Sequence, residues 1–185
     1  MEKKDIGRKM KNLRLMLSEP EKASAAEEVF SQLEKSAAFA LADNICMYNS
    51  LPDELSTRVF LAKWHGRKHF YLPRVNGVNL DILPYSPDKL HIGAYDIDEP
   101  DGDETFNPEN LDLIIVPAVA FDKNGNRLGR GKGFYDRLLS STGATTIGVA
   151  YDFQLLESLP TEPHDIPVDM VITQSSVIIR NKTKR

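Results

Sequence analysis

The stretch LIIVPAVAFDKNGNRLGRGKGFYD occupies residues 113–136 and joins an apolar run to a cationic, glycine-rich loop. Three glycines of this loop alternate with Arg130 and Lys132. Glycine lets backbone N–H groups approach an anion closely, and the two cations add full positive charge at the same place. A helix that begins near Gly133 would add its N-terminal dipole. The pattern therefore predicts a buried strand followed by a polyphosphate-binding loop.

The loop is not a Walker A motif. Reading back from Lys132, Asn126 stands where that motif has its first glycine, and Gly133 stands where it has Ser or Thr. The chain also contains no GxSxG, no HExxH and no Cys/His pair, and its four histidines are scattered. The sequence therefore gives no support to nucleophilic or zinc-dependent hydrolysis.

The composition is typical of a globular protein: 185 residues, 41% hydrophobic and 27% charged. We expect one domain over residues 1–185, with the last few residues frayed. A net charge of −4 argues against general binding of nucleic acid. The single cysteine, Cys46, excludes a disulfide framework and is expected in the core, in a reducing compartment.

The longest apolar run, residues 113–121, contains Pro117 and is too short to span a membrane. The charged N-terminus lacks the hydrophobic region of a signal peptide. We expect a cytoplasmic protein, a monomer, without nucleic-acid or membrane partners.

Hydrophobic periodicity predicts helices that alternate with strands. We expect helices over residues 3–17, from a cap at Ser18 through about 38, from a cap at Asp53 or Ser56 through 64, and over 134–141. We expect strands at 45–49, 69–72 (ended by Pro73), 80–85, 113–116, 146–150 and 170–173, with an edge strand at 177–179. This order predicts an α/β domain with a mostly parallel sheet, which binds ligands beyond the carboxyl ends of its strands.

Residues 95–112 hold eight acidic residues, two prolines and a glycine, and no Lys or Arg. We expect a surface loop here, long enough to act as a lid or binding loop.

Carboxylates and aromatic rings near these strand ends could carry chemistry. Asp136 lies one turn into the helix after the loop and could hold Mg²⁺, which prefers oxygen ligands, or could act only as a helix-dipole aspartate. Asp165 and Asp169 are candidates for a second carboxylate. Phe134 or Tyr135 could stack on a flat ring.

At these residues the chain resembles the 5-formyltetrahydrofolate cyclo-ligases, also called methenyltetrahydrofolate synthetases. The central element of that family is a VPG-hydrophobic-AFD strand followed by GxRLGxGxGYYD, and this chain has VPAVAFDKNGNRLGRGKGFYDR over residues 116–137. Further matches in order are a Lys-x-x-x-Arg (Lys4, Arg8), Ser-x-x-Glu (18–21), Glu-x-x-Thr (Glu54, Thr57), LPR (72–74) and LPTEPHDIPVDMVIT (159–173).

The resemblance implies an enzyme that uses ATP and Mg²⁺ to convert 5-formyltetrahydrofolate, with or without a polyglutamate tail, to 5,10-methenyltetrahydrofolate, ADP and phosphate. It also implies a three-layer fold similar to the NagB/RpiA/CoA-transferase-like group. Arg130 and Lys132 would be catalytic through charge neutralisation, and Asp136 and Asp165 would hold the metal. The implied ATP-binding residues are Lys4, Arg8, Arg127, Leu128, Gly129, Arg130, Gly131, Lys132, Gly133, Phe134 and Tyr135. The implied folate-binding residues are Asn49, Glu54, Arg130, Gly131, Lys132, Gly133 and Phe134.

Three positions depart from the family pattern. Ala118 replaces a glycine, which should affect only local packing. Phe134 replaces a common tyrosine, so this side chain can stack but cannot donate a hydrogen bond. Asn49 is polar where the family often has an apolar residue.

Two other classes of function remain open from the residues. A sugar-phosphate isomerase or CoA transferase would share the architecture, but it would not need a cationic Gly-x-Gly-x-Gly loop beside a metal-binding aspartate. A non-catalytic nucleotide- or folate-binding module could lose the metal site, whereas this chain keeps both Asp136 and Asp165.

Overall fold

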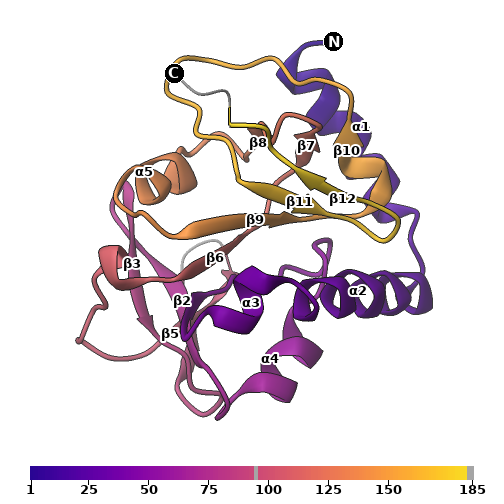
Figure 1. The fold of residues 1–185 in the computed structure, drawn as a ribbon. Helices are drawn as coiled ribbons and strands as arrows, with labels where there is room; N and C mark the ends of the chain where they lie inside the picture. The colour runs from indigo at the N-terminus through magenta and orange to yellow at the C-terminus, as the bar shows by residue number, and fades with distance from the viewer. Residues whose placement is uncertain (94–95, 183–185) are drawn as a thin grey trace.

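A seven-stranded sheet forms the centre of the computed structural model, which describes residues 1–93 and 96–182 (Figure 1). Its strand order is β12-β11-β9-β6-β1-β2-β3. The five inner strands pair in parallel, and β12 and β3 pair antiparallel at the two edges. The predicted α/β fold with a mostly parallel sheet is confirmed. The strands are β1 (Asn44–Cys46), β2 (His69–Asn76), β3 (Asn79–Pro84), β6 (Leu113–Val116), β9 (Thr145–Val149), β11 (Met170–Ile172) and β12 (Val177–Ile179).

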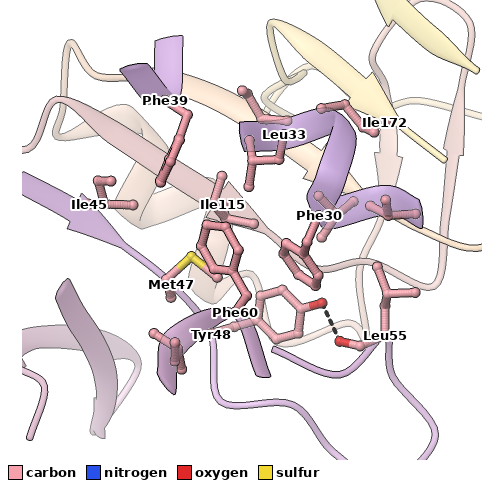
Figure 2. Packing of buried hydrophobic residues seen from close by; sticks show 14 of the residues in the cluster. Phe30, Leu33, Phe39, Ile45, Met47, Tyr48, Leu55, Phe60, Ile115 and Ile172 are labelled. Atoms are coloured by element: carbon pink, nitrogen blue, oxygen red, sulfur yellow. Dashed lines mark hydrogen bonds between the residues drawn. The ribbon is translucent and has the colours of Figure 1, made fainter. Parts of the chain in front are cut away.

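Helices cover both faces of this sheet, because its central strands are apolar on both sides (Figure 1). In β6, Ile115 packs toward α2 (Glu19–Glu34), α3 (Ala37–Leu41) and α4 (Arg58–Trp64), whereas Ile114 packs toward α5 (Phe134–Ser140). This alternation follows from the two-residue period of a strand. Figure 2 shows the first of these two cores. Within the described ranges, no helix is both long and apolar enough to cross a membrane.

A second, three-stranded sheet lies beyond the end of β6 and was not predicted. It consists of β7 (Ala120–Asp122), β8 (Arg127–Leu128) and β10 (Leu155–Leu156), the last of which follows the short helix η3 (Asp152–Gln154). The buried carboxylate of Asp122 organises the turn between β7 and β8, since it accepts hydrogen bonds from the N–H groups of Asn124, Asn126 and Leu159. Helix α1 (Lys3–Leu15) packs on this small sheet through Ile6 and Met10.

The prediction of a loop over residues 95–112 was wrong in part; position 95 lies outside the described residues. The segment contains β5 (Asp98–Pro100), which pairs antiparallel with β4 (Leu90–Ile92), and a short helix η2 (Pro108–Asn110). The buried Glu99 accepts a hydrogen bond from the N–H of Val75, and Arg74 donates to the carbonyls of Pro100 and Gly102. These long-range contacts with β2 hold the segment in a regular structure, although its composition is typical of a loop.

Some predicted boundaries were also wrong. Strand β2 continues through Pro73, because its pairing with β1 stops at Tyr71 and only the ladder with β3 continues. The second helix ends at Glu34, since the Ser36 hydroxyl accepts from the N–H of Phe39 and caps a separate helix.

Two further boundaries moved near β1. The predicted strand at 45–49 is shorter, because the chain leaves the sheet after Cys46. Helix α4 begins after Thr57, whose hydroxyl donates to the carbonyl of Tyr48. Neither Asp53 nor Ser56 is its cap residue.

Candidate active site

A cavity of about 1120 Å³ lies at the carboxyl ends of β1 and β6 and beside β2. This is where a parallel α/β sheet is expected to bind ligands. The volume exceeds the upper end of the range of about 300–1,000 Å³ for small-molecule sites. Its lining contains both apolar and charged side chains. The lining residues include Tyr48 and Asn49 after β1, Pro117 and Ala118 after β6, Pro73 and Val75 of β2, Leu80 of β3, and the glycine loop, which we define as residues 129–133.

The glycine loop connects β8 to α5 and has a conformation that requires glycine. Gly131 has φ of 89° and Gly133 has φ of 69°, both in the left-handed region. A Cβ at Gly133 would lie 2.7 Å from Nη1 of Arg137. The same guanidinium donates to the carbonyl of Lys132 at 2.7 Å. The loop is therefore held in shape by its own helix, with Lys132 exposed at the cavity.

Arg130 joins the glycine loop to the segment after β1. Its Nη2 lies 3.2 Å from Oε1 of Glu54 and 3.3 Å from Oδ1 of Asp53. Glu54 is itself fixed, because Oε2 accepts from the N–H of Leu51 at 3.0 Å. The structure thus brings together two residues predicted from distant parts of the sequence, Glu54 and Arg130, and adds Asp53, which was not predicted as a site residue.

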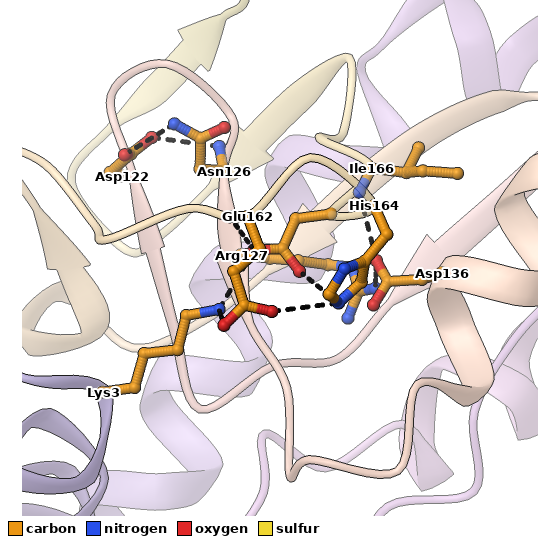
Figure 3. Close-up of polar contacts among 9 residues, drawn as sticks. Lys3, Asp122, Asn126, Arg127, Asp136, Glu162, His164 and Ile166 are labelled. Carbon is orange, nitrogen blue, oxygen red and sulfur yellow. Dashed lines mark hydrogen bonds and ion pairs between the residues drawn. The ribbon is translucent and has the colours of Figure 1, made fainter.

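Arg127 precedes the glycine loop, lines the cavity and pairs with Asp136 (Figure 3). The Arg127 side chain is only 5% exposed; its Nη2 is 2.5 Å from Oδ1 of Asp136, and its guanidinium lies 5.9 Å from the centre of the Tyr135 ring. The same Oδ1 accepts from the N–H of Ile166 at 3.1 Å. Burial raises the pKa of Tyr135 well above its ordinary value, so this phenol stays neutral.

Asp165 belongs to a cluster with Glu162, His164 and Lys3 (Figure 3). Lys3 Nζ is 3.1 Å from Oδ2 of Asp165 and 3.3 Å from Oε1 of Glu162. His164 Nε2 is 3.2 Å from Oε2 of Glu162 and 3.5 Å from Oδ1 of Asp165. One possible ligand atom from each of Glu162, His164 and Asp165 lies within 4.8 Å of the others.

The charges of this cluster shift its pKa values. Burial acts to raise the pKa of Asp165, but the N–H of Glu162 and the ammonium of Lys3 outweigh it and lower that pKa. Burial acts to lower the pKa of Lys3, but Asp165 and Glu162 outweigh it and raise that pKa. The aspartate is therefore ionised, as a metal ligand must be.

The other predicted residues fall into different places. Leu128, Gly129, Phe134 and Asn49 line the cavity, with Asn49 Nδ2 donating to the carbonyl of Asp98 at 3.2 Å. Asp169 lies instead between β9 and β11, where it accepts from the N–H of Thr146 and pairs with Lys182.

On α1, Lys4 and Arg8 are exposed, and Lys3 is the lysine that lines the cavity. The role of Lys4 and Arg8 in binding ATP stays a prediction. Lys3, Glu162 and His164 were missed by the sequence reasoning. The signal for the last two was present in the run EPHD at 162–165, where three ligand-type side chains occur within four residues.

Comparison with known proteins points to one family. Residues 1–174 match the model of the 5-formyltetrahydrofolate cyclo-ligase family. The 5-formyltetrahydrofolate cyclo-ligase of Escherichia coli K12 is 37% identical over 147 residues, which cover 74% of this chain and 81% of the relative. That of Mus musculus is 30% identical, over 90% of this chain and 94% of the relative.

A solved structure supports the same relationship. The NMR structure of 5,10-methenyltetrahydrofolate synthetase from Aquifex aeolicus superposes with a TM-score of 0.90 at 36% identity. It covers 100% of this chain and 96% of its own.

Proposed function

Because this chain belongs to the 5-formyltetrahydrofolate cyclo-ligase family, we propose that it converts 5-formyltetrahydrofolate and ATP to 5,10-methenyltetrahydrofolate, ADP and phosphate. The observation that carries this proposal is the lining of the cavity, which combines the cationic glycine loop with apolar side chains of β2 and β3. A phosphate chain suits the first surface and a flat ring suits the second. Family membership favours this reaction over a sugar-phosphate isomerase, a CoA transferase or a non-catalytic binding module.

The chemistry requires activation of a poor leaving group. The N5-formyl oxygen attacks the γ-phosphorus of ATP, the bond to the β,γ-bridging oxygen breaks, and ADP leaves. N10 then attacks the formyl carbon of the resulting imidate-like phosphate, the C–O bond breaks, and phosphate and the N10 proton are released. As in other phosphoryl transfers, the protein contributes mainly alignment and neutralisation of charge.

Residues of the glycine loop would neutralise the transferring phosphoryl group. Arg130 and Lys132 bring positive charge to the cavity, and the φ values of Gly131 and Gly133 hold the backbone in turns that L side chains rarely adopt. Arg127 also lines the cavity, but its guanidinium is paired with Asp136, so we assign it to supporting the glycine loop.

The folate would lie against the apolar part of the lining. Pro73, Val75 and Leu80 offer an apolar surface for the ring, and Phe134 can stack from the side of the loop. One carboxylate oxygen of Glu54 pairs with Arg130 and the other accepts from a backbone N–H. Glu54 can therefore hold a bound folate at a fixed position relative to the glycine loop. Asn49 lines the same space.

The donors near Asp165 fit Mg²⁺, because Asp165 and Glu162 offer carboxylate oxygens that already hold the cationic Lys3 between them. Asp136 fits less directly, since its Oδ1 holds Arg127 and the N–H of Ile166. When bound, Mg²⁺ supplies positive charge to the phosphate oxygens of ATP. Asp165 and Asp136 would hold it, with Glu162 as a further ligand.

One assay tests the function. Purified protein is mixed with 5-formyltetrahydrofolate, with and without MgATP, and absorbance of the methenyl product is followed together with release of ADP. We expect methenyl product and ADP in equal amounts, only with MgATP present. Tight folate binding without ATP-dependent absorbance would contradict the proposal and would indicate a binding module.

A further inference from the structure

Arg14 is a buried cation in a position where the helix pattern calls for an apolar side chain. It follows Ile6 and Met10 at intervals of four residues and shares their buried face of α1. Its side chain is 4% exposed, and within the described part of the chain its Nε and Nη1 have no hydrogen-bond partner. Burying such a group is unfavourable unless a partner compensates its charge. Arginine at this position therefore calls for a reason beyond packing.

The partner of Arg14 leads directly to the glycine loop. Nη2 of Arg14 lies 3.4 Å from Oδ2 of Asp53, and the other oxygen of Asp53 lies 3.3 Å from Nη2 of Arg130. Arg130 continues to Glu54 at 3.2 Å. Positive and negative groups thus alternate from the buried face of α1 to the cavity.

Exposure increases from Arg14 through Asp53 to Arg130, whereas Glu54, the other partner of Arg130, is 14% exposed. Arg14 is 4% exposed, Asp53 is 31% exposed and Arg130 is 48% exposed. Arg14 is therefore the most buried of these groups, and Arg130 is the most exposed one, which can move toward a ligand. Burial lowers the pKa of Arg14 below its ordinary value, and the charge of Asp53 offsets only part of this effect.

We propose that Arg14 is a positioning residue for the cyclo-ligase reaction, which fixes Asp53 so that Asp53 and Glu54 can present Arg130 to a phosphate group in the cavity. When phosphate draws the Arg130 guanidinium away, Asp53 keeps the charge of Arg14 beside it and is not left as an unpaired carboxylate. Arg14 thereby lowers the cost of transferring Arg130 from protein to substrate. This inference rests on the role proposed above for Arg130.

The test compares Arg14→Met in two backgrounds, the unaltered protein and Arg130→Ala. The measured quantity is kcat/KM for ATP at saturating 5-formyltetrahydrofolate and well below the melting temperature. In the unaltered background we expect about a tenfold loss, the effect of one charged contact. In the Arg130→Ala background we expect little further loss, because Arg14 acts through Arg130. An equal loss in both backgrounds would overturn the inference.

Matched variants separate positioning from general stability. Lys9→Met removes a positive charge from an exposed position of the same helix and should leave kcat/KM unchanged. If Arg14→Met does not fold, Asp53→Asn interrupts the same path at a more exposed residue and should show the same dependence on Arg130. Arg14→Lys keeps the charge and should recover part of the loss. A lower melting temperature with unchanged kcat/KM would show a structural role only and would also overturn the inference.

The outcomes also distinguish this inference from the function on which it rests. Absence of methenyl product with the unaltered protein would contradict the function itself. Full activity of Arg130→Ala would contradict the role of Arg130, and with it the positioning role. Loss of activity in Arg130→Ala together with an additive effect of Arg14→Met would contradict only the positioning role.

Discussion

The two sides of this molecule are built on different physical principles. Between α2, α4 and the sheet, aromatic rings pack directly on one another. The rings of Phe30 and Phe60 stack with their centres 4.8 Å apart (Figure 2), and Phe60 meets Phe70 edge-on at 6.1 Å. Around the cavity, side chains of opposite charge pair with one another, as Arg127 does with Asp136 (Figure 3). Aromatic packing resists changes of pH and salt, whereas charge pairs can exchange a protein partner for a ligand.

The segment after β1 connects the two regions. Tyr48 belongs to the aromatic core, and its hydroxyl donates to the carbonyl of Leu55 at 2.7 Å. Between these two residues lie Asp53 and Glu54, which hold Arg130. The core therefore fixes the ends of a segment whose middle serves the cavity. Substitutions in the first region should change stability, and substitutions in the second should change kinetics.

The largest effect is expected in the core. Phe60 is buried and contacts the rings of Phe30, Phe39 and Phe70, so Phe60→Ala should lower the free energy of unfolding by about 3–5 kcal/mol. Denaturant unfolding measures this, and Val59→Ala, at an exposed neighbouring position, should change it little. Activity of the folded variant should stay near normal at low temperature. A loss below about 1 kcal/mol would mean that the rings repack and the core is softer than its geometry implies.

The next effect belongs to the glycine loop. Lys132→Ala should lower kcat/KM for ATP about ten- to hundredfold, because a charged hydrogen bond is worth roughly 1.5–3 kcal/mol. Its melting temperature should change little, since the side chain is exposed. Lys123→Ala is the matched control, because it removes a lysine that pairs with Glu157 at the surface. Normal ATP kinetics in Lys132→Ala would contradict the assignment of this loop to phosphate.

The sequence predicted the parts of the fold whose pattern is local. Continuous apolar runs such as residues 113–116 identify buried parallel strands wherever they occur. The small sheet escaped prediction because β8 and β10 have two residues each, too few to show a period. Strand β5 was not predicted, because its acidic composition is typical of a loop. Its position depends on the burial of Glu99 against β2, which the local sequence does not indicate.

The same limit applies to the site. The glycine loop could be predicted, because its glycines and cations are adjacent in sequence. The contact of Lys3 with Asp165 joins residues 162 positions apart, and no local pattern encodes it. Lys3 and Lys4 point in directions that differ by about 100° around the helix axis. The hydrophobic pattern of so short a helix does not determine which of the two lysines lines the cavity.

A smaller effect concerns the metal. Asp165→Asn should raise the Mg²⁺ concentration that half-saturates activity by about tenfold or more, since loss of even outer partners of a metal weakens binding about 10–100-fold. Asp136→Asn should also raise it and should in addition lower the melting temperature, because Arg127 would lose the carboxylate that compensates its buried charge. Mg²⁺ titrations of activity and thermal unfolding of both variants measure this difference. If the Mg²⁺ dependence of activity is unchanged in both variants, the two aspartates have structural roles and do not bind the metal.

The smallest expected effect lies on α1 and divides its cations into two groups. Lys3 lines the cavity, whereas Lys4 and Arg8 are exposed one turn apart on another side of the helix. If a bound ATP reaches this exposed pair, Arg8→Ala should raise the KM for ATP by up to about fivefold, since an exposed ion pair is worth up to about 1 kcal/mol. Stability should barely change. Lys9→Ala is the matched control. An unchanged KM for ATP in both Lys4→Ala and Arg8→Ala would show that these two side chains are only solvated and do not bind ATP. A raised KM for ATP in Lys3→Met alone would show that this helix contacts ATP through Lys3, at the cavity.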